Sequence, residues 1–177
     1  MKSLIKMPHM VVASDSMWST DASHDWHTDP TDYMGHPRTS GSHALVLKMG
    51  REAGVPLMFT LSQLSYWSAL HLGEAGLESM KVRGRMQEGM VADITIFNPE
   101  TVAEGSDYKG GENGLPSMGI PYVIVFGQLV KRDNEATDVF PGVPIRFPAE
   151  EKARFVPASQ DQWLNTFSID SSMLVPK

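Results

Sequence analysis

The sequence predicts a mixed α/β protein, and three features of its patterning support this. The apolar run MVVA, residues 10–13, is typical of a short buried strand. Residues 42–54 and 60–72 carry apolar side chains at helical spacing. After residue 80 the spacing changes to the alternation of strands, in ADITIF and PYVIVFGQLVKR. We therefore expect a strand, two helices and then a small antiparallel sheet.

The composition excludes several classes of protein. Of 177 residues, 41% are hydrophobic and 20% charged, which is enough for a packed core. The net charge of −6 disfavours nucleic acid or an anionic membrane as a partner. The absence of cysteine excludes disulfides and thiolate metal sites. Lys6, Pro8 and His9 interrupt the apolar N-terminus and disfavour a signal peptide, so a cytoplasmic location is expected.

The chain divides into three parts by pattern. Residues 1–80 contain the first strand, a long polar loop at 15–41 and the two helices. Residues 81–132 contain strands and turns, and residues 133–177 form an irregular proline-rich tail. A loop as long as 15–41 inside a compact domain is often functional.

Capping residues place the helix ends. Ser42 is the expected N-cap of the first helix, and Gly54 the residue that stops it. Thr60 and Gln63 form a capping-box pattern that would begin the second helix. The apolar face of this second helix, expected to pack in the core, comprises Leu61, Leu64 and Trp67.

The second half predicts a hairpin. Ile94 and Ile96 alternate with Thr95 and Phe97, so the two pairs lie on opposite faces of a strand. Residues 121–132 contain two apolar strands joined by a turn at Gly127–Gln128.

Asp15 follows the first strand directly, which is unusual because a carboxylate is costly to bury without a partner. Two interpretations remain open from the residues alone. The side chain caps a turn, or it stands at the end of the strand because chemistry takes place there.

Four motifs occur in the order ASDSMW, GHPRTSG, RGRMQEGMVADITIFNPETV and GIPYVIVFGQLV. Together they resemble the amidohydrolase superfamily, and within it the N-acyl-D-amino-acid deacylases, which include D-aminoacylases and the D-glutamate deacylase-like branch. The resemblance extends from about residue 4 to about residue 165. The glycine-rich ADITIF motif points to the superfamily, whereas ASDS followed by HPR points to the D-aminoacylase branch.

This resemblance implies a fold. Members of the family combine a metal-dependent (β/α)8 barrel with a small β-sandwich built from both chain ends. Residues 10–14 would be the last barrel strand, with Asp15 at its C-terminal end, where barrel active sites lie. Residues 81–132 would be the returning sandwich strands. The fold expected is thus a C-terminal piece of the barrel (last strand, long loop and helices) with part of the sandwich.

The resemblance also implies the catalytic residue. The aspartate that matches Asp15 takes a proton from a metal-bound water and gives it to the leaving amine, and in some relatives it also binds the metal. Zinc lowers the pKa of such a water towards about 7. The alternative is that Asp15 only caps the following turn.

Three further residues would bind the substrate. By resemblance, Arg38 binds the α-carboxylate of the N-acyl amino acid. A guanidinium suits this role because it stays charged and can donate two hydrogen bonds to one carboxylate. His36 would orient Arg38 or line the pocket, and Ser16 stands beside the catalytic aspartate. The alternative for Arg38 is a surface arginine in a loop.

Other residues carry weaker expectations. His24 and His27, with Asp25 and Asp29, are more typical of a solvated polar loop than of a metal cluster. Trp18 would either line the pocket for the acyl group or pack in the core. In the tail, the segment expected to dock on the sandwich or on a neighbouring subunit contains Trp163, Leu164 and Phe167.

The remaining metal ligands of the family, a His-x-His pair, a bridging residue and two later histidines, lie on earlier strands without a counterpart here. We therefore expect a fragment of a longer zinc-dependent enzyme, inactive alone, whose reaction converts N-acyl-D-amino acids to a carboxylate and a D-amino acid. Its partners would be the small-molecule substrate and either the missing barrel portion or a second copy. Two alternatives remain: a dihydropyrimidinase-like or dihydroorotase-like cyclic amidase, in which HPR is not expected, and a non-catalytic truncated subunit.

Overall fold

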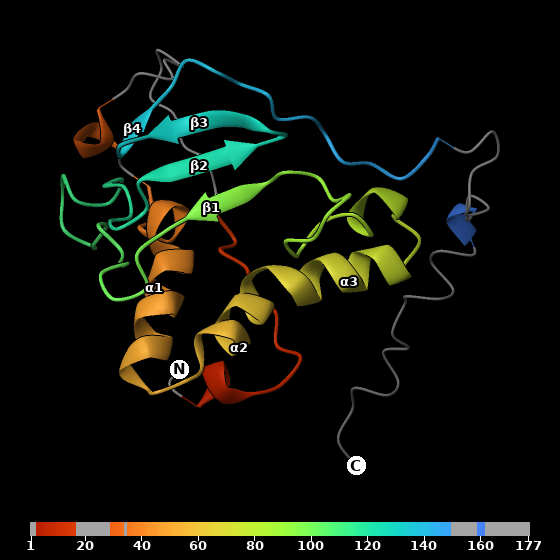
Figure 1. Cartoon of the computed structure of the whole chain (residues 1–177), viewed down its shortest axis with the longest axis horizontal. Helices are drawn as coiled ribbons and strands as arrows, with labels where there is room; N and C mark the ends of the chain where they lie inside the picture. The colour runs from red at the N-terminus through yellow and green to blue at the C-terminus, as the bar shows by residue number, and fades with distance from the viewer. Residues whose placement is uncertain (1–2, 17–28, 34, 150–158, 162–177) are drawn as a thin grey trace. The chain divides into compact units, whose positions relative to one another are not determined.

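The computed structural model describes residues 3–16, 29–33, 35–149 and 159–161 (Figure 1). The chain divides into two compact units, Met1–Arg146 and Phe147–Lys177. The helices and turns of the first unit are η1 Leu4–Lys6, η2 Pro30–Asp32, α1 Arg38–Glu52, α2 Leu57–Leu61, η3 Ser62–Tyr66, α3 Trp67–Glu74 and η4 Glu78–Met80. Its strands are β1 Ile94–Ile96, β2 Tyr122–Val125, β3 Gln128–Arg132 and β4 Glu135–Ala136. Within the described ranges, none of these helices has the length and apolarity that crossing a bilayer requires.

Helix α1 begins earlier than predicted and ends where predicted. It starts at Arg38, directly after Pro37, and the Ser42 hydroxyl donates to the Arg38 carbonyl at 2.8 Å. Ser42 is therefore inside the helix, and its assignment as N-cap is wrong because Pro37 is already held near helical φ. At the other end, Gly54 has φ +66° and its N–H donates to Arg51. The Val55 N–H donates to Gly50 at 2.9 Å, which completes a Schellman motif.

The second helical segment also begins early. Helix α2 starts at Leu57 after Pro56, so Thr60 lies inside it and is 2% exposed. The predicted capping box is therefore wrong, because Pro56 has already started the helix. The turn η3 is π-helical and leads directly into α3. The core prediction is confirmed for Leu61 and Leu64, which pack against the buried cluster described below.

The four strands form one antiparallel sheet in the order β1-β2-β3-β4, in which β2 lies between β1 and β3 (Figure 1). The predicted small antiparallel sheet is thus confirmed, whereas the barrel and the sandwich stay predictions. Val125 pairs with Gln128, so the turn is Phe126–Gly127 and not Gly127–Gln128. Both turn residues have positive φ, 52° and 77°, as a two-residue hairpin turn with the right twist requires.

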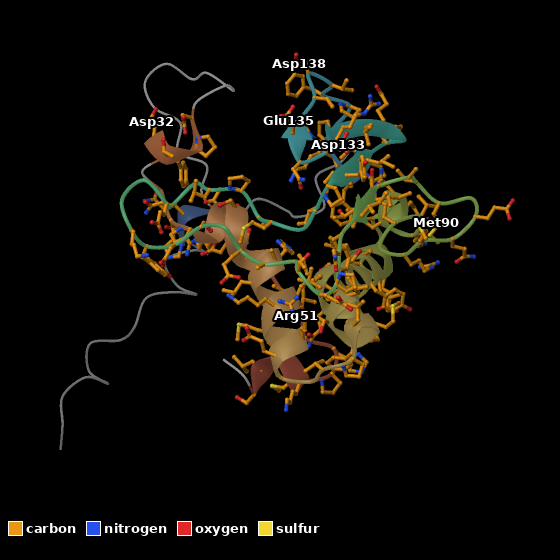
Figure 2. All side chains as sticks on the ribbon, turned by 60° about the vertical axis from the view of Figure 1, so that its left-hand side comes forward. Asp32, Arg51, Met90, Asp133, Glu135 and Asp138 are labelled. Atoms are coloured by element: carbon orange, nitrogen blue, oxygen red, sulfur yellow. The ribbon has the colours of Figure 1, made fainter. Side chains whose placement is uncertain are left out.

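The core of the first unit lies where α1 meets the segment after β1. Ala44 and Leu47 of α1 pack with Val102, which is 1% exposed. Arg51 of α1, labelled in Figure 2, donates to the carbonyls of Pro99 and Val102 at 2.9 and 3.0 Å. The partly buried side chains that complete this core are Leu61, Leu64, Phe97 and Ile120.

The N-terminal segment differs from the prediction. Residues 10–13 form no β-ladder with any described residue, and Val11 is 46% exposed, so the predicted buried strand is not formed within the described part of the chain. A strand needs a neighbour to satisfy its backbone groups, and here the Val12 N–H donates instead to the Gln63 carbonyl at 3.0 Å. The segment is extended chain held against a helix.

The aspartate of the ADITIF motif joins two distant parts of the sheet region. Asp93 Oδ1 accepts the N–H of Phe126 at 2.8 Å, at the β2–β3 turn. Asp93 Oδ2 lies 3.2 Å from Arg83 Nε. The Gly127 N–H donates to the Ala92 carbonyl at 2.9 Å beside it. One carboxylate therefore ties the entry of β1 to the hairpin turn, which explains structurally why an acidic residue stands there.

We predict that Asp93→Ala lowers the free energy of unfolding by about 1–2 kcal/mol, because it leaves the Phe126 N–H and Arg83 without their acceptor. Urea denaturation followed by circular dichroism measures this. The matched control is Asp138→Ala, an exposed aspartate just beyond β4 near Asp133 and Glu135 (Figure 2), which should change the value by less than about 0.5 kcal/mol. Equal values for the two variants would contradict the prediction.

Candidate functional site

Asp15 and Arg38, which are separated by a long loop in the sequence, meet in the structure. Arg38 Nη1 lies 3.2 Å from Asp15 Oδ2, with the aspartate side chain 86% exposed and the arginine side chain 33% exposed. Arg38 is the first residue of α1, and Asp15 ends the N-terminal segment with φ +48°. Aspartate tolerates this left-handed region better than most residues. The two residues that the sequence selects for chemistry and binding are therefore direct neighbours.

His36 stabilises the start of α1. Its Nδ1 accepts the backbone N–H of Arg38 at 3.0 Å. Its Nε2 lies 3.3 Å from the Tyr108 hydroxyl, and the two rings meet edge to face at 5.1 Å between centroids. This geometry suits a residue that orients the turn carrying Arg38, and the predicted role in substrate binding stays a prediction.

Ser16 does not join this group. Its N–H donates to the Ser14 hydroxyl at 3.3 Å, and no contact with Arg38 or His36 is found in the described part of the chain. Asp29 accepts hydrogen bonds from the N–H and hydroxyl of Thr31 at 2.9 and 2.7 Å, and the backbone hydrogen bond lowers the pKa of Asp29. It caps a turn. The other predicted residues lie outside the described ranges: Trp18, His24, Asp25, His27, Trp163, Leu164 and Phe167.

A cavity of about 200 Å³ adjoins Arg38. The Arg38 Nε is buried and has no hydrogen-bond partner among the described residues. A buried guanidinium N–H without an acceptor is costly, and a carboxylate or another anion is the acceptor that a guanidinium binds best. The residues that line the cavity and carry polar side chains are His36, Arg38, Ser42, Glu104, Ser106, Asp107 and Tyr108.

The two acidic side chains of this cavity already have cationic partners. Lys48 Nζ donates to Glu104 at 2.7 Å, and this hydrogen bond to the carboxylate raises the pKa of Lys48. Lys109 Nζ lies 3.5 Å from Asp107. Each acidic side chain of the cavity therefore has a cationic neighbour, although Lys109 is shared with Glu112.

No protein-family profile and no curated protein matches the chain. A crystal structure of D-aminoacylase, described as defining a novel subset of amidohydrolases, is 30% identical, with a TM-score of 0.51 over 59% of this chain and 21% of that one. The resemblance to the amidohydrolases is confirmed.

Two further solved structures describe metal-containing relatives. One, with the same identity, coverage and TM-score, concerns the binuclear metal centre of D-aminoacylase, in which one metal activates and the second attenuates. Another is N-acyl-D-glutamate deacylase from Bordetella bronchiseptica with zinc and a phosphonate that mimics the tetrahedral intermediate. It is 35% identical, with a TM-score of 0.47 over 54% of this chain and 19% of that one. The chain spans about a fifth of the length of these amidohydrolases.

The described residues do not by themselves form the metal centre of an amidohydrolase. No group of three or more histidine or acidic side chains gathers among them in a way that would hold a metal ion. Asp15 can supply one carboxylate oxygen, but its Oδ2 faces the positive charge of Arg38. Any metal bound next to Asp15 therefore needs further ligands from side chains other than these.

A loop that no sequence pattern indicated supports the HPR motif. Residues 103–118, here called the Ser106 loop, are closed by a bridge between Ala103 and Met118. Three of its side chains donate to backbone carbonyls around Arg38: Ser106 to Pro37 at 2.9 Å, Asn113 to Gly35 at 3.1 Å and Ser117 to Ser40 at 2.6 Å. A run of serine, asparagine and glycine reads only as a turn in the sequence, so no local signal shows what it holds.

We predict that Ser106→Ala loosens the turn that carries Arg38, because Ser106 is 8% exposed and its hydroxyl donates to Pro37. Hydrogen exchange measured by mass spectrometry should be faster in residues 35–41, with a loss of about 1 kcal/mol in the free energy of unfolding. Ser65→Ala removes a comparable hydroxyl-to-carbonyl bond, to Gly84, and should leave the exchange of residues 35–41 unchanged. Unchanged exchange in both variants would show that the Ser106 loop does not hold this turn.

Proposed function

We propose that this chain is part of a metal-dependent amidohydrolase that cleaves the amide bond of N-acyl-D-amino acids. The observation that carries the proposal is the pairing of Asp15 with Arg38 beside a cavity, at 3.2 Å between Arg38 Nη1 and Asp15 Oδ2. A proton-transfer group and a carboxylate-binding group next to one another fit a substrate whose acyl amide adjoins a carboxylate. The similarity to D-aminoacylase supports the same substrate class.

Arg38 binds the substrate in this proposal. The α-carboxylate of the N-acyl amino acid accepts from the guanidinium, including the Nε that has no partner among the described residues. His36 and the Ser106 loop keep the first turn of α1 in place for this contact. A lysine would keep the charge at position 38 but not the bidentate geometry.

Asp15 moves the proton. Water adds to the amide carbonyl carbon while the Asp15 carboxylate takes one of its protons. The C–N bond then breaks as Asp15 returns that proton to the leaving nitrogen, which gives a carboxylic acid and the free D-amino acid; the acid then loses its remaining proton to the amine or to water. The exposure of Asp15 leaves its carboxylate open on the side away from Arg38.

We further propose that the enzyme carrying this chain holds zinc, as the solved relatives with metals suggest. The metal ligands other than Asp15 come from side chains beyond the described residues. Cytoplasmic location, the barrel and the sandwich belong to the same proposal.

We predict that a preparation containing this chain and the remaining ligands binds about one zinc ion and hydrolyses N-acetyl-D-amino acids but not the L-isomers. Elemental analysis and a substrate panel measure this, and removal of zinc by a chelator should abolish hydrolysis, with recovery on adding zinc back. The chain extended upstream is compared with the chain alone. No zinc and no hydrolysis in any preparation would overturn the proposal, and hydrolysis of cyclic amides instead would favour the dihydropyrimidinase-like alternative.

We predict separate kinetic effects for the two central residues. Asp15→Asn should lower kcat about 10²–10⁴-fold, because the amide cannot accept the proton. Arg38→Lys should raise KM about tenfold or more with a smaller effect on kcat, because it weakens substrate binding. Steady-state kinetics on one substrate measure both. The control is Lys81→Ala, which removes an exposed charge that pairs with Glu78 and does not line the cavity. A kcat unchanged in Asp15→Asn would exclude Asp15 as the proton-transfer group.

A further inference from the structure

Gln63 is the one polar side chain in the described structure with 0% exposure. It lies in the π-helical turn η3, between α2 and α3. Single π-helical turns inside helices often occur at functional sites. Because solvent does not reach Gln63, this side chain can influence function only through the residues that it contacts.

The π-helical turn changes what the Gln63 carbonyl can accept. In an α-helix the Trp67 N–H would donate to Gln63, four residues earlier. Here the Trp67 N–H donates to Ser62, five residues earlier. The Gln63 carbonyl is correspondingly open to the side, and it accepts the Val12 N–H at 3.0 Å.

The side chain of Gln63 makes a second hydrogen bond to the same N-terminal segment. Its Nε2 donates to the Met7 carbonyl at 3.0 Å, which assigns the orientation of the amide. Between these two contacts, the His9 ring packs on Trp67 with 4.3 Å between centroids. Residues 7–12 are thus fixed at both ends and near their middle by a single stretch of helix.

Asp15 follows this fixed stretch by three residues. The segment has no β-ladder to determine its course, so the bonds from Gln63 determine where the chain arrives at Arg38. The structure keeps this arrangement although the Gln63 Oε1 is buried without a hydrogen-bond partner among the described residues. An unsatisfied buried oxygen is costly, and a residue chosen only for packing would be apolar.

We propose that Gln63 is a positioning residue for Asp15: its two hydrogen bonds to residues 7–12 set the place from which Asp15 transfers the proton. The proposal rests on the proposed function, because it needs Asp15 to be the proton-transfer group. It predicts an effect on the chemical step and not on substrate binding, since Arg38 is held separately by His36 and the Ser106 loop.

The test is Gln63→Met in the enzyme that carries this chain, because methionine keeps the volume and removes the donor to Met7. We expect kcat to fall roughly tenfold with KM changed by less than about twofold, as for a displaced catalytic group. Hydrogen exchange in residues 7–15 should be faster. Ser65→Ala is the control: Ser65 lies in the same π-helical turn, but its hydroxyl donates to the Gly84 carbonyl and not to residues 7–12, so kcat should stay as in the wild type.

A double-mutant cycle separates positioning from general damage to the fold. In an Asp15→Asn background, Gln63→Met should cause no further loss of the residual rate, because the group it positions is already disabled. An equal fractional loss in both backgrounds, or a wild-type kcat in the single variant, would overturn the proposal. A wild-type kcat in Asp15→Asn alone would overturn the proposed function instead.

Where Gln63→Met does not fold, Gln63→Glu takes its place. An ionised glutamate repels the Met7 carbonyl, whereas a protonated one donates to it again. The ratio of variant to wild-type kcat should therefore rise as the pH falls. A ratio that does not change with pH would show that the bond to Met7 does not control catalysis.

Discussion

Helix α1 packs against Val102, and most of the described structure depends on this contact. Ala44 and Leu47 form the buried core with Val102, and Arg51 fastens the same segment by two carbonyl hydrogen bonds. The Ser106 loop follows Val102 directly and returns to the first turn of α1. Because that turn begins with Arg38, the core and the candidate site are built on one helix, and a change that shifts α1 must move both.

Asp15 reaches the site by a different route. The N-terminal segment has no strand partner in the described structure and is held instead by the π-helical turn at Gln63. The distance between Asp15 and Arg38 therefore depends on how α1 and α2 pack on each other. Gly50 of α1 faces Thr60 of α2. The two residues are so close that a Cβ added at Gly50 would collide with the Thr60 hydroxyl. Close packing of the two helices thus determines the separation of two residues proposed for one reaction.

The family motifs have different physical roles in this chain. In ADITIF, Asp93 is structural, because it ties the entry of β1 to the hairpin turn and lies away from the cavity residues. In HPR, the histidine and proline lie at the start of α1, and the arginine is the group that we propose for substrate binding. The first motif therefore concerns the fold, whereas the second concerns the proposed binding of substrate. This difference is why the fold and the activity need separate experiments.

Local signals were sufficient for some elements. Gly54 ends α1 because only a residue free to adopt φ +66° permits the Schellman motif, and alternation with a glycine turn predicts the hairpin. Asp15 and Arg38 were also identified as candidate site residues from their motifs. The sequence did not reveal that Ser42 and Thr60 lie inside helices, because prolines before them start both helices early. It did not reveal that residues 10–13 lack a ladder, or that Gln63 and the Ser106 loop hold the site. Each of these depends on a hydrogen-bond partner far away in the chain, and only tertiary packing decides which distant group that partner is.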